Sequence, residues 1–308
     1  MTRVFVLGNA TLDVILYVDR MPAAGETRLA SSMTRCAGGK GLNQAVVASR
    51  AGARTILVTP VGADADGGLL QAALEGEPNL EAEWLPSGAP TDVSCIWVAD
   101  SGENMIVSTA ASAHAITRDD ALHALARIEA GDILLVQGNL GPATTLAACS
   151  VARTRGARTI LNTAPIAWDQ REVLSICDVV VANEPECHAL LGPGGTAAAF
   201  LRLGPSLAVV TLGSRGAVLA DESGQRIVPA PRVQAVDTAG AGDVLTGVLA
   251  AELASGSVPQ RALEIAVAAA SLSVTRPGTS PSFPAAAEIE HLRAIRHSPV
   301  RGSDAGSS

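Results

Sequence analysis

The stretch Asp237-Thr-Ala-Gly-Ala-Gly-Asp243 is followed directly by Val-Leu-Thr-Gly-Val-Leu-Ala-Ala-Glu-Leu. Its small residues allow several backbone N–H groups to converge at the start of a helix, where the helix dipole also favours an anion. The segment after Asp243 is apolar on most of its circumference, which predicts a buried helix. A carboxylate beside an anion site in a dry interior is what phosphoryl transfer to a hydroxyl needs. Taken alone, the stretch is equally compatible with an Asp that caps a helix after a flexible glycine loop.

The composition is that of a globular protein, with 48% hydrophobic and 17% charged residues among 308. No apolar run reaches the length of a membrane span, and the first apolar run, residues 4–7, is too short for a signal peptide. The net charge of −8 argues against a nucleic-acid partner, because a phosphate backbone needs a basic surface. The five cysteines are scattered and odd in number, so we expect reduced thiols and a cytoplasmic protein.

Short apolar runs alternate with helical segments along most of the chain. The predicted strands are residues 4–7, 55–58, 133–136, 159–162, 179–182, 208–211 and 217–220, and the predicted helices include 43–51, 118–129, 144–154 and 186–191. Continuously apolar strands separated by helices are typical of an α/β fold with a doubly wound, mostly parallel central sheet and helices on both faces. Ligands bind such sheets at the carboxyl ends of the strands.

Two segments, residues 10–36 and 91–108, lack a helical period and read as two β-hairpins that pair into a small β-sheet lid. Residues 1–9, 37–90 and 109–297 are expected to form the α/β nucleotide-binding and catalytic domain, and 298–308 a disordered tail. The pair Gly38-Gly39 lies where the lid returns to this domain, and Lys40, the only lysine in the chain, follows it. Glycines allow close backbone approach, so we favour a functional role for this loop.

Five ordered segments resemble the ribokinase-like carbohydrate kinases, and the resemblance covers essentially residues 3–295. They are Gly-Gly-Lys-Gly-Leu-Asn-Gln-Ala-Val (38–46), Asn-Glu-Pro-Glu (183–186), Thr-Leu-Gly-Ser-Arg-Gly (211–216), Val-Gln-Ala-Val-Asp-Thr-Ala-Gly-Ala-Gly-Asp (233–243) and Val-Thr-Arg-Pro-Gly-Thr-Ser-Pro-Ser (274–282). The resemblance implies an ATP-dependent kinase of a small-molecule sugar that uses Mg²⁺ and a monovalent cation such as K⁺. It also implies a homodimer that pairs through the lid.

The resemblance assigns a role to each matching position. Asp243 is the expected catalytic base, and the backbone amides of Ala239, Gly240, Ala241 and Gly242 are the expected anion hole. The expected nucleotide-binding residues are Asn183, Thr211, Gly213, Gly216 and Gly242, with Asn162 near the phosphates. The expected metal positions are Asn183 and Glu186 for Mg²⁺, through water or phosphate, and Asp237, Ala239, Gly278 and Ser282 for the monovalent cation. The expected substrate-binding residues are Thr11, Asp13, Gly38, Gly39, Lys40, Asn43 and Asn139.

The sugar side matches the family less closely than the phosphate side. Thr11 stands where the family has Asn, and Gln137-Gly-Asn139 stands where it has a Glu that contacts the sugar. Such changes alter the hydrogen-bond pattern that sets specificity. The resemblance favours transfer to the 5-hydroxyl of D-ribose and leaves another pentose, a ketohexose or a nucleoside open. A nucleoside is mildly disfavoured, because only 2% of the residues are aromatic and able to stack on a base.

The motifs also have structural explanations and competing functions. Asn183 and Glu186 can be a strand end and a helix start, and residues 213–216 can be a hairpin turn. An oxidoreductase is disfavoured because Gly-Asn-Ala-Thr-Leu-Asp (8–13) lacks the Gly-x-Gly-x-x-Gly turn, and a P-loop kinase because no Gly-x-x-x-x-Gly-Lys-Ser/Thr occurs. A non-catalytic sugar-binding protein would not need an anion site beside Asp243.

Overall fold

The computed structural model describes residues 2–295, so the tail expected at 298–308 lies outside the part of the chain considered below. The strands are β1 (Arg3–Leu7), β2 (Thr11–Val18), β3 (Ser32–Gly38), β4 (Arg54–Val61), β5 (Leu80–Pro86), β6 (Val93–Ala99), β7 (Asn104–Ser108), β8 (Ile133–Gln137), β9 (Arg158–Asn162), β10 (Val179–Asn183), β11 (Leu207–Thr211), β12 (Ala217–Asp221) and β13 (Gly224–Val228). The helices are α1 (Lys40–Arg50), α2 (Ala65–Ala73), α3 (Ala111–Ala115), α4 (Arg118–Ala124), α5 (Pro142–Thr154), α6 (Arg171–Leu174), α7 (Glu184–Leu191), α8 (Ala197–Leu201), α9 (Ala241–Ala254), α10 (Pro259–Ser273) and α11 (Ala286–Ala294). Short 3₁₀ turns occupy Leu125–Arg127, Gly213–Arg215 and Ser280–Ser282.

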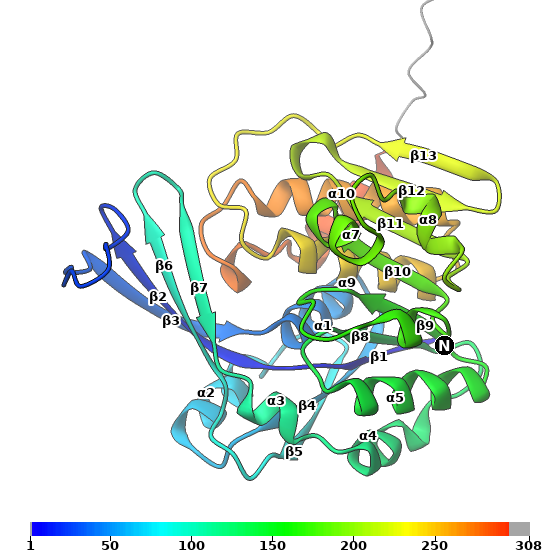
Figure 1. The fold of residues 1–308 in the computed structure, drawn as a ribbon, viewed down its shortest axis with the longest axis horizontal. Coiled ribbons are helices and arrows are strands. Elements are labelled where there is room, and N and C mark those ends of the chain that lie inside the picture. The colour runs from blue at the N-terminus through cyan, green and yellow to red at the C-terminus, as the bar shows by residue number, and fades with distance from the viewer. Residues whose placement is uncertain (1, 296–308) are drawn as a thin grey trace, which may run out of the picture.

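The strands form two separate sheets (Figure 1). The large sheet has nine strands in the order β13-β12-β11-β10-β9-β8-β1-β4-β5. It is parallel from β5 to β11, and only β12 and β13 are antiparallel additions at one edge. The expected α/β fold with a mostly parallel central sheet and a second, smaller sheet is therefore confirmed. No helix within residues 2–295 is both long and apolar enough to cross a membrane.

The central strands are apolar on both faces because helices cover both. Val4 and Val6 of β1 belong to one core with α1, α9 and α10, whereas Phe5 and Leu7 belong to the other core with α4 and α5. Successive side chains of a strand point to opposite faces, so a strand covered on both sides must be apolar at every position. This explains why the central strands appear in the sequence as unbroken apolar runs.

Helix α9 is buried from Asp243 to Leu253 and packs against both α1 and α10. Gly247 permits the close approach of α1, because a Cβ at this position would lie 2.6 Å from the backbone oxygen of Gln44. Truncation of a fully buried side chain such as Leu249 is expected to cost about 2–5 kcal/mol of stability. Tight packing of α9 on α1 fixes the N-terminal ends of both helices relative to each other.

The carboxyl ends of four adjacent parallel strands carry polar residues. They are Gln137 of β8, Asn162 of β9, Asn183 of β10 and Thr211 of β11. Register pairs Gln137 with Asn162, and Asn183 with Thr211. The apolar runs therefore end at one edge of the sheet in a row of hydrogen-bonding groups.

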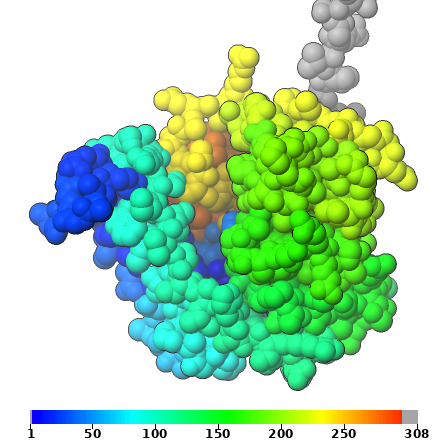
Figure 2. All heavy atoms as spheres, in the orientation of Figure 1, coloured from blue at the N-terminus to red at the C-terminus, as the bar shows by residue number. Residues whose placement is uncertain are grey.

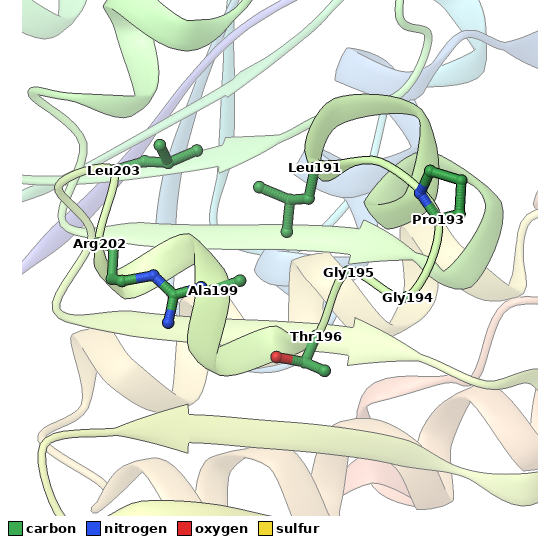
Figure 3. A pocket seen from close by; sticks show the side chains of 8 residues that line it. All are labelled: Leu191, Pro193, Gly194, Gly195, Thr196, Ala199, Arg202 and Leu203. Carbon is green, nitrogen blue, oxygen red and sulfur yellow. The ribbon is translucent and has the colours of Figure 1, made fainter.

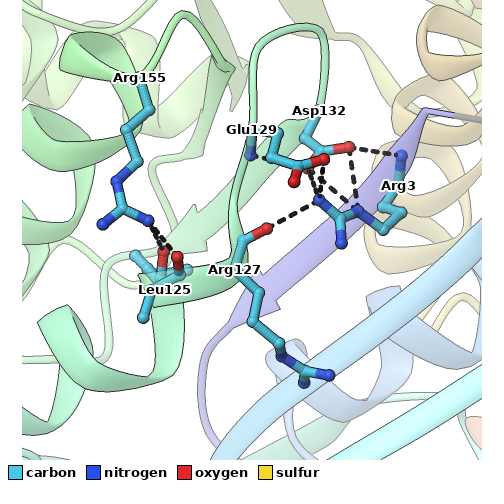
Figure 4. A network of polar contacts seen from close by, with 7 residues as sticks. Arg3, Leu125, Arg127, Glu129, Asp132 and Arg155 are labelled. Carbon is cyan, nitrogen blue, oxygen red and sulfur yellow. Dashed lines mark hydrogen bonds and ion pairs between the residues drawn. The ribbon is translucent and has the colours of Figure 1, made fainter.

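The opposite end of the sheet is held by an arginine network (Figure 4). The backbone N–H of Arg3 donates to Asp132 Oδ1 at 2.9 Å, and its guanidinium contacts Asp132 Oδ2 at 2.7 Å and the Arg127 carbonyl at 2.7 Å. Asp132 is only 4% exposed, so this ion pair is shielded from water. The network joins the start of β1 to the turn before β8, at the end of the sheet remote from the polar strand ends.

The small sheet has the order β3-β2-β6-β7 and extends from one side of the body (Figure 1). Strands β2 and β3 are antiparallel, as are β6 and β7, and β2 pairs with β6 in parallel. Asp13 of β2 lies opposite Ser94 of β6, which in turn lies opposite Ser108 of β7. These side chains share the sheet face that is turned toward the body.

Candidate active site

Two cavities meet at the loop that precedes α9. The first, which we call the cleft, has a volume of about 570 Å³ and lies between the small sheet and the body. Figure 2 shows it as a hollow between the cyan strands and the green part of the body. The second, the α10 pocket, has a volume of about 590 Å³ and is bounded by α9, α10 and the end of β11. Thr238 lines both cavities, Gly240 and Asp243 line the cleft, and Ala241 and Gly242 line the pocket.

Asp243 lies in the first turn of α9, only 5% exposed, at the bottom of the cleft. Its Oδ2 accepts a hydrogen bond from Asn43 Nδ2 at 3.0 Å, and its Oδ1 accepts one from Gln44 Nε2 at 2.9 Å. Lys40 Nζ lies 3.8 Å from the same Oδ1. Three side chains from the first turns of α1 therefore orient one carboxylate, and both of its oxygens act as acceptors.

The loop before α9 depends on Gly240. This residue has φ +77°, in the left-handed region, and a Cβ here would lie 2.8 Å from atoms of Phe283 and of Thr279. Two of the four amides expected in the anion hole are already engaged. Ala239 N–H donates to Asp237 Oδ1 at 2.9 Å, and Ala241 N–H lies 3.4 Å from the Thr238 carbonyl.

Three other amides remain for an anion. Within residues 2–295 the N–H groups of Gly240, Gly242 and Asp243 have no hydrogen-bond partner, as expected for the first turn of a helix. Gly242 also has no atom within 4 Å of the position that a Cβ would occupy. Free amides, open space and a helix N-terminus together make the junction of the two cavities suitable for an anion.

Asp237 ties two loops together beside this junction. Its Oδ1 accepts from Ala239 N–H and its Oδ2 from Gly278 N–H, both at 2.9 Å. Ser282 Oγ donates to the Thr279 carbonyl at 2.7 Å. In the described part of the chain no group of three or more His, Cys, Asp or Glu side chains could hold a metal ion.

Asp13 is a further carboxylate of the cleft. Thr11 Oγ1 donates to its Oδ1 at 2.8 Å. Burial raises the pKa of Asp13 to about 6, against the lowering effect of hydrogen bonds from Thr11 and Ser94, and the charge of Asp243 raises it further. Gly38 makes room for this group, because a Cβ at Gly38 would lie 2.1 Å from Asp13 Oδ2.

The structure brings the predicted substrate-binding residues to one cavity. Gly39 has φ +92° and turns the chain from β3 into α1, which places Lys40 at the start of the helix. Asn139 follows β8, and its Oδ1 is buried without a partner among the described residues. The positions that line the cleft are Thr11, Asp13, Gly39, Lys40, Asn43 and Asn139, while Gly38 lies beside Asp13.

Four of the five predicted nucleotide-binding residues lie on the other side of the junction, whereas Asn183 lines neither cavity. Thr211, Gly213, Gly216 and Gly242 all line the α10 pocket. Apolar side chains of α9 and α10, among them Leu245 and Val267, line the same pocket. Its walls suit a flat, partly apolar ring, and its open end reaches the free amides before α9.

Asn183 and Glu186 form a capping box at the start of α7. Asn183 Oδ1 accepts from Glu186 N–H at 2.8 Å, and Glu186 Oε2 accepts from Asn183 N–H at 3.0 Å. Thr163 Oγ1 also donates to Glu186 Oε2 at 2.8 Å. The buried Oδ1 of Asn162, on the neighbouring strand, lacks a partner in the described chain. Carboxylate and amide oxygens accept hydrogen bonds from water that is bound to Mg²⁺, so these residues fit a water-mediated Mg²⁺ position as well as a helix cap.

A further hollow of about 290 Å³ lies between α7 and α8 (Figure 3). Leu191, Pro193 and Arg202 contribute side chains to its wall. None of the residues predicted for the site lines it. It is therefore separate from the junction around Asp243.

Sequence reasoning gave no role to several residues of the site. Gln44 lies within a quoted motif, yet nothing in its spacing indicated a bond to a residue 199 positions away. Gln137 Nε2 donates to Gln44 Oε1 at 2.9 Å and so fixes the orientation of that amide. Ser94 of β6 and Ser108 of β7 also line the cleft. Their place on one face of a strand with alternating side chains was the only signal in the sequence.

Comparison with known proteins gives consistent similarities over nearly the whole chain. The profile of the pfkB family carbohydrate kinases matches residues 1–286. The chain is 32% identical over 293 residues to the ribokinase of Bacillus subtilis (strain 168), which covers 95% of this chain and 99% of that protein. The solved structure of ribokinase from Thermotoga maritima has a TM-score of 0.85 at 32% identity and covers 95% of this chain and 99% of its own. That of Arabidopsis thaliana ribokinase complexed with ribose and ATP has a TM-score of 0.84 at 28% identity, covering 96% and 100%.

Proposed function

Because this chain belongs to the pfkB family of carbohydrate kinases, we propose that it transfers the γ-phosphoryl group of ATP to the 5-hydroxyl of D-ribose. The products are ribose 5-phosphate and ADP. The observation that carries this proposal is the junction at residues 238–243, where Asp243 lines the cleft and Gly242 lines the α10 pocket. A hydroxyl and a terminal phosphate held in the two cavities would meet at this loop.

In the proposed reaction Asp243 takes the proton of the sugar hydroxyl as that oxygen attacks the γ-phosphorus in line and ADP leaves. Asn43 and Gln44 keep the carboxylate pointed at the hydroxyl through the bonds of 3.0 and 2.9 Å. The free N–H groups of Gly240, Gly242 and Asp243 stabilise the charge on the equatorial phosphate oxygens. The O–H bond of the sugar therefore breaks toward Asp243 as its oxygen forms a new bond to the γ-phosphorus, and the bond from that phosphorus to the ADP oxygen breaks.

Two helix N-termini and one ammonium provide the positive potential for this step. The N-terminal residues of α1 (Gly39, Lys40) and of α9 (Gly240, Asp243) line the same cleft. Helix N-termini attract phosphate, and their effect is stronger where water is excluded. Lys40, whose Nζ lies 3.8 Å from Asp243 Oδ1, is proposed to interact with the transferred group.

The proposed cofactors are Mg²⁺ and a monovalent cation. When bound with ATP, Mg²⁺ supplies charge neutralisation between the phosphates, and Asn183, Glu186 and Asn162 are the residues that would orient its water ligands. A monovalent cation, K⁺ in the first instance, would lie beside Asp237, Ala239, Gly278 and Ser282. Its proposed role is to fix the loop that presents the free amides.

D-Ribose is proposed as substrate because Asp13, Asn43 and Asn139 offer both acceptors and donors to a polyol. The Arabidopsis relative that was solved with ribose and ATP supports the choice.

The test is a coupled ADP-release screen of purified protein with pentoses, ketohexoses and nucleosides, each with and without K⁺. We expect the largest kcat/KM with D-ribose and a rise in rate with K⁺. Turnover of a nucleoside but not of D-ribose would replace the proposed substrate.

We propose that the small sheet acts as a lid over the cleft, with Gly38 and Gly39 at its hinge. Its strands supply one wall of the cleft, and β3 runs directly into α1 through these glycines. Closure would exclude water, which otherwise competes with the sugar as phosphoryl acceptor. Residues 10–36 and 91–108 form this lid in the proposed domain division.

The opposite face of the small sheet is proposed to pair with a second copy of the chain. Cross-strand register aligns Met33, Leu16, Trp97 and Met105 in one row, and Met33 and Met105 are 58% and 50% exposed. Exposed apolar rows of this kind favour association. Sedimentation equilibrium is expected to give a dimer, and Met105→Glu a monomer at the same concentration; a monomeric wild-type protein would contradict the pairing.

A cytoplasmic location is proposed from the cysteine chemistry. Cys36, Cys95, Cys149, Cys177 and Cys187 are all free thiols. Even the buried pair Cys149 and Cys177, whose sulfurs lie 3.9 Å apart, is not bonded. Free thiols are typical of a reducing compartment, which is also where ATP is available.

A further inference from the structure

A row of hydroxyl groups crosses the small sheet and ends on the Asp13 carboxylate. Ser108 Oγ donates to Ser94 Oγ at 2.9 Å, Ser94 Oγ to Thr11 Oγ1 at 3.3 Å, and Thr11 Oγ1 to Asp13 Oδ1 at 2.8 Å. The four side chains all line the cleft. Strands β2, β6 and β7 each contribute at least one member, so the row spans three of the four strands of the lid.

The direction of this row is set by its last member. An ionised carboxylate only accepts hydrogen bonds, so the single hydrogen of Thr11 must point to Asp13. The oxygen of Thr11 is then free to accept from Ser94, and that of Ser94 to accept from Ser108. Hydrogen bonds aligned in one direction polarise each other, so the two serines strengthen the bond that Thr11 gives to Asp13.

We propose that Ser94 and Ser108 are positioning residues that hold Asp13 in its ionised, sugar-binding form. The inference rests on the proposed function, because it takes Asp13 to be a sugar ligand. Thr11 Oγ1 donates to Asp13 Oδ1, and Ser94 lies close enough to the carboxylate to lower its pKa. Within residues 2–295 no other side chain donates a hydrogen bond to this carboxylate, which leaves acceptor positions on it for sugar hydroxyls. The two serines therefore act on sugar affinity and not on the proton transfer at Asp243.

The electrostatic surroundings of Asp13 explain why its protonation depends on these hydrogen bonds. Its pKa is raised to about 6 by burial, and the hydrogen bonds from Thr11 and Ser94 oppose that rise. On the neighbouring strand β6, Ser94 lies opposite Asp13 in register. Asp243 on α9 and Cys36 on β3 interact electrostatically with Asp13, and Lys40 on α1 and Asp237 before α9 line the same cleft. Loss of Ser94 removes a lowering influence, so Asp13 should take up a proton at higher pH.

The kinetic test compares wild type, Ser94→Ala and Ser108→Ala between pH 6 and pH 8.5. Loss of one net hydrogen bond predicts a rise of about three- to tenfold in KM for D-ribose near pH 6.5 with Ser94→Ala, shrinking toward pH 8.5. Ser108→Ala should act in the same direction with a smaller effect, and kcat should stay within about twofold in both. Thr34→Ala is the matched control, because Thr34 is an exposed hydroxyl of the same sheet that does not line the cleft.

A second measurement needs no substrate and separates this inference from the proposed function. The ¹³C resonance of the Asp13 carboxyl, titrated in the free enzyme, should move its midpoint to higher pH in Ser94→Ala and stay unchanged in Thr34→Ala. An unchanged midpoint in Ser94→Ala overturns the positioning role, as does an equal loss of sugar affinity at every pH. A shifted midpoint in a protein that does not phosphorylate D-ribose supports the positioning role and rejects the proposed substrate.

Discussion

Gln44 Nε2 lies 2.9 Å from Asp243 Oδ1, and the other end of the same amide accepts from Gln137 Nε2 at 2.9 Å. All three side chains are buried. A reversed Gln44 amide would point an oxygen at the carboxylate and an NH₂ group at another NH₂ group. Gln137, at the end of β8, therefore fixes the Gln44 amide, and Gln44 in turn fixes the carboxylate of the proposed base, Asp243.

Replacement of Gln44 should damage turnover more than binding. Gln44→Leu removes one of the two donors that aim Asp243, and a misaligned base predicts a fall in kcat of about ten- to a hundredfold. KM for the sugar should change little, because Gln44 does not line the cleft. Steady-state kinetics checks the split. Gln44→Glu places a second carboxylate beside Asp243, and the two carboxylates should compete for one proton. The rate of this variant should therefore recover as the pH rises and that proton is lost.

Asp243→Asn should leave the fold intact and lower kcat by about 10²–10⁴ if Asp243 is the general base. The new amide can be accommodated, because Asn43 Oδ1 is buried without a partner among residues 2–295 and can turn to accept from it. Thermal unfolding checks stability, and coupled ADP release checks rate. Near-normal turnover of this variant would remove Asp243 from the mechanism.

The two glycines before and inside α9 should respond differently to alanine. Gly240→Ala places a Cβ 2.8 Å from Phe283 and Thr279 in a left-handed backbone, so we expect a loss of roughly 1–3 kcal/mol in unfolding free energy. Gly242→Ala meets no atom within 4 Å and should keep full stability. Its methyl group points into space proposed for phosphate, so KM for ATP should rise by at least about tenfold. Denaturant melts and ATP titrations of both variants distinguish the effects.

Asp13→Asn should stabilise the protein while weakening sugar binding. The pKa of Asp13 is raised to about 6 in the folded state, above its usual value in an unfolded chain. Its contribution to stability is therefore fully present below the unfolded pKa and is lost as pH rises through about 6. Asparagine does not ionise, so the variant should gain about 2–3 kcal/mol over wild type at pH 8. The gain should vanish near pH 4, and urea melts at both pH values check the sign.

Sequence patterns located the central strands because those strands are buried on both faces and are therefore apolar throughout. They missed β5 and β13, which lie at the two edges of the sheet and carry charged residues on their open sides. Helix α9 was evident because the apolar stretch after Asp243 has no polar face. Edge strands and short surface helices offer no such uniform signal.

The chemistry of the candidate site was partly predictable, because glycine loops and a carboxylate at a helix start have physical meaning on their own. The supporting contacts were not. Gln44 meets Asp243 across 199 positions, and Ser94 meets Thr11 across 83, so only the packed fold brings them together. Asn183 and Glu186 show the reverse case, since one spacing serves both a helix cap and the expected metal position.

The arginine network at Arg3 and Asp132 has a practical consequence for experiments. It anchors the start of β1 at the end of the sheet that lies away from the cleft and the α10 pocket. A fluorophore or a surface tether joined ahead of Arg3 would thus leave both openings unobstructed. Opening and closing of the small sheet could then be followed on single immobilised molecules during turnover.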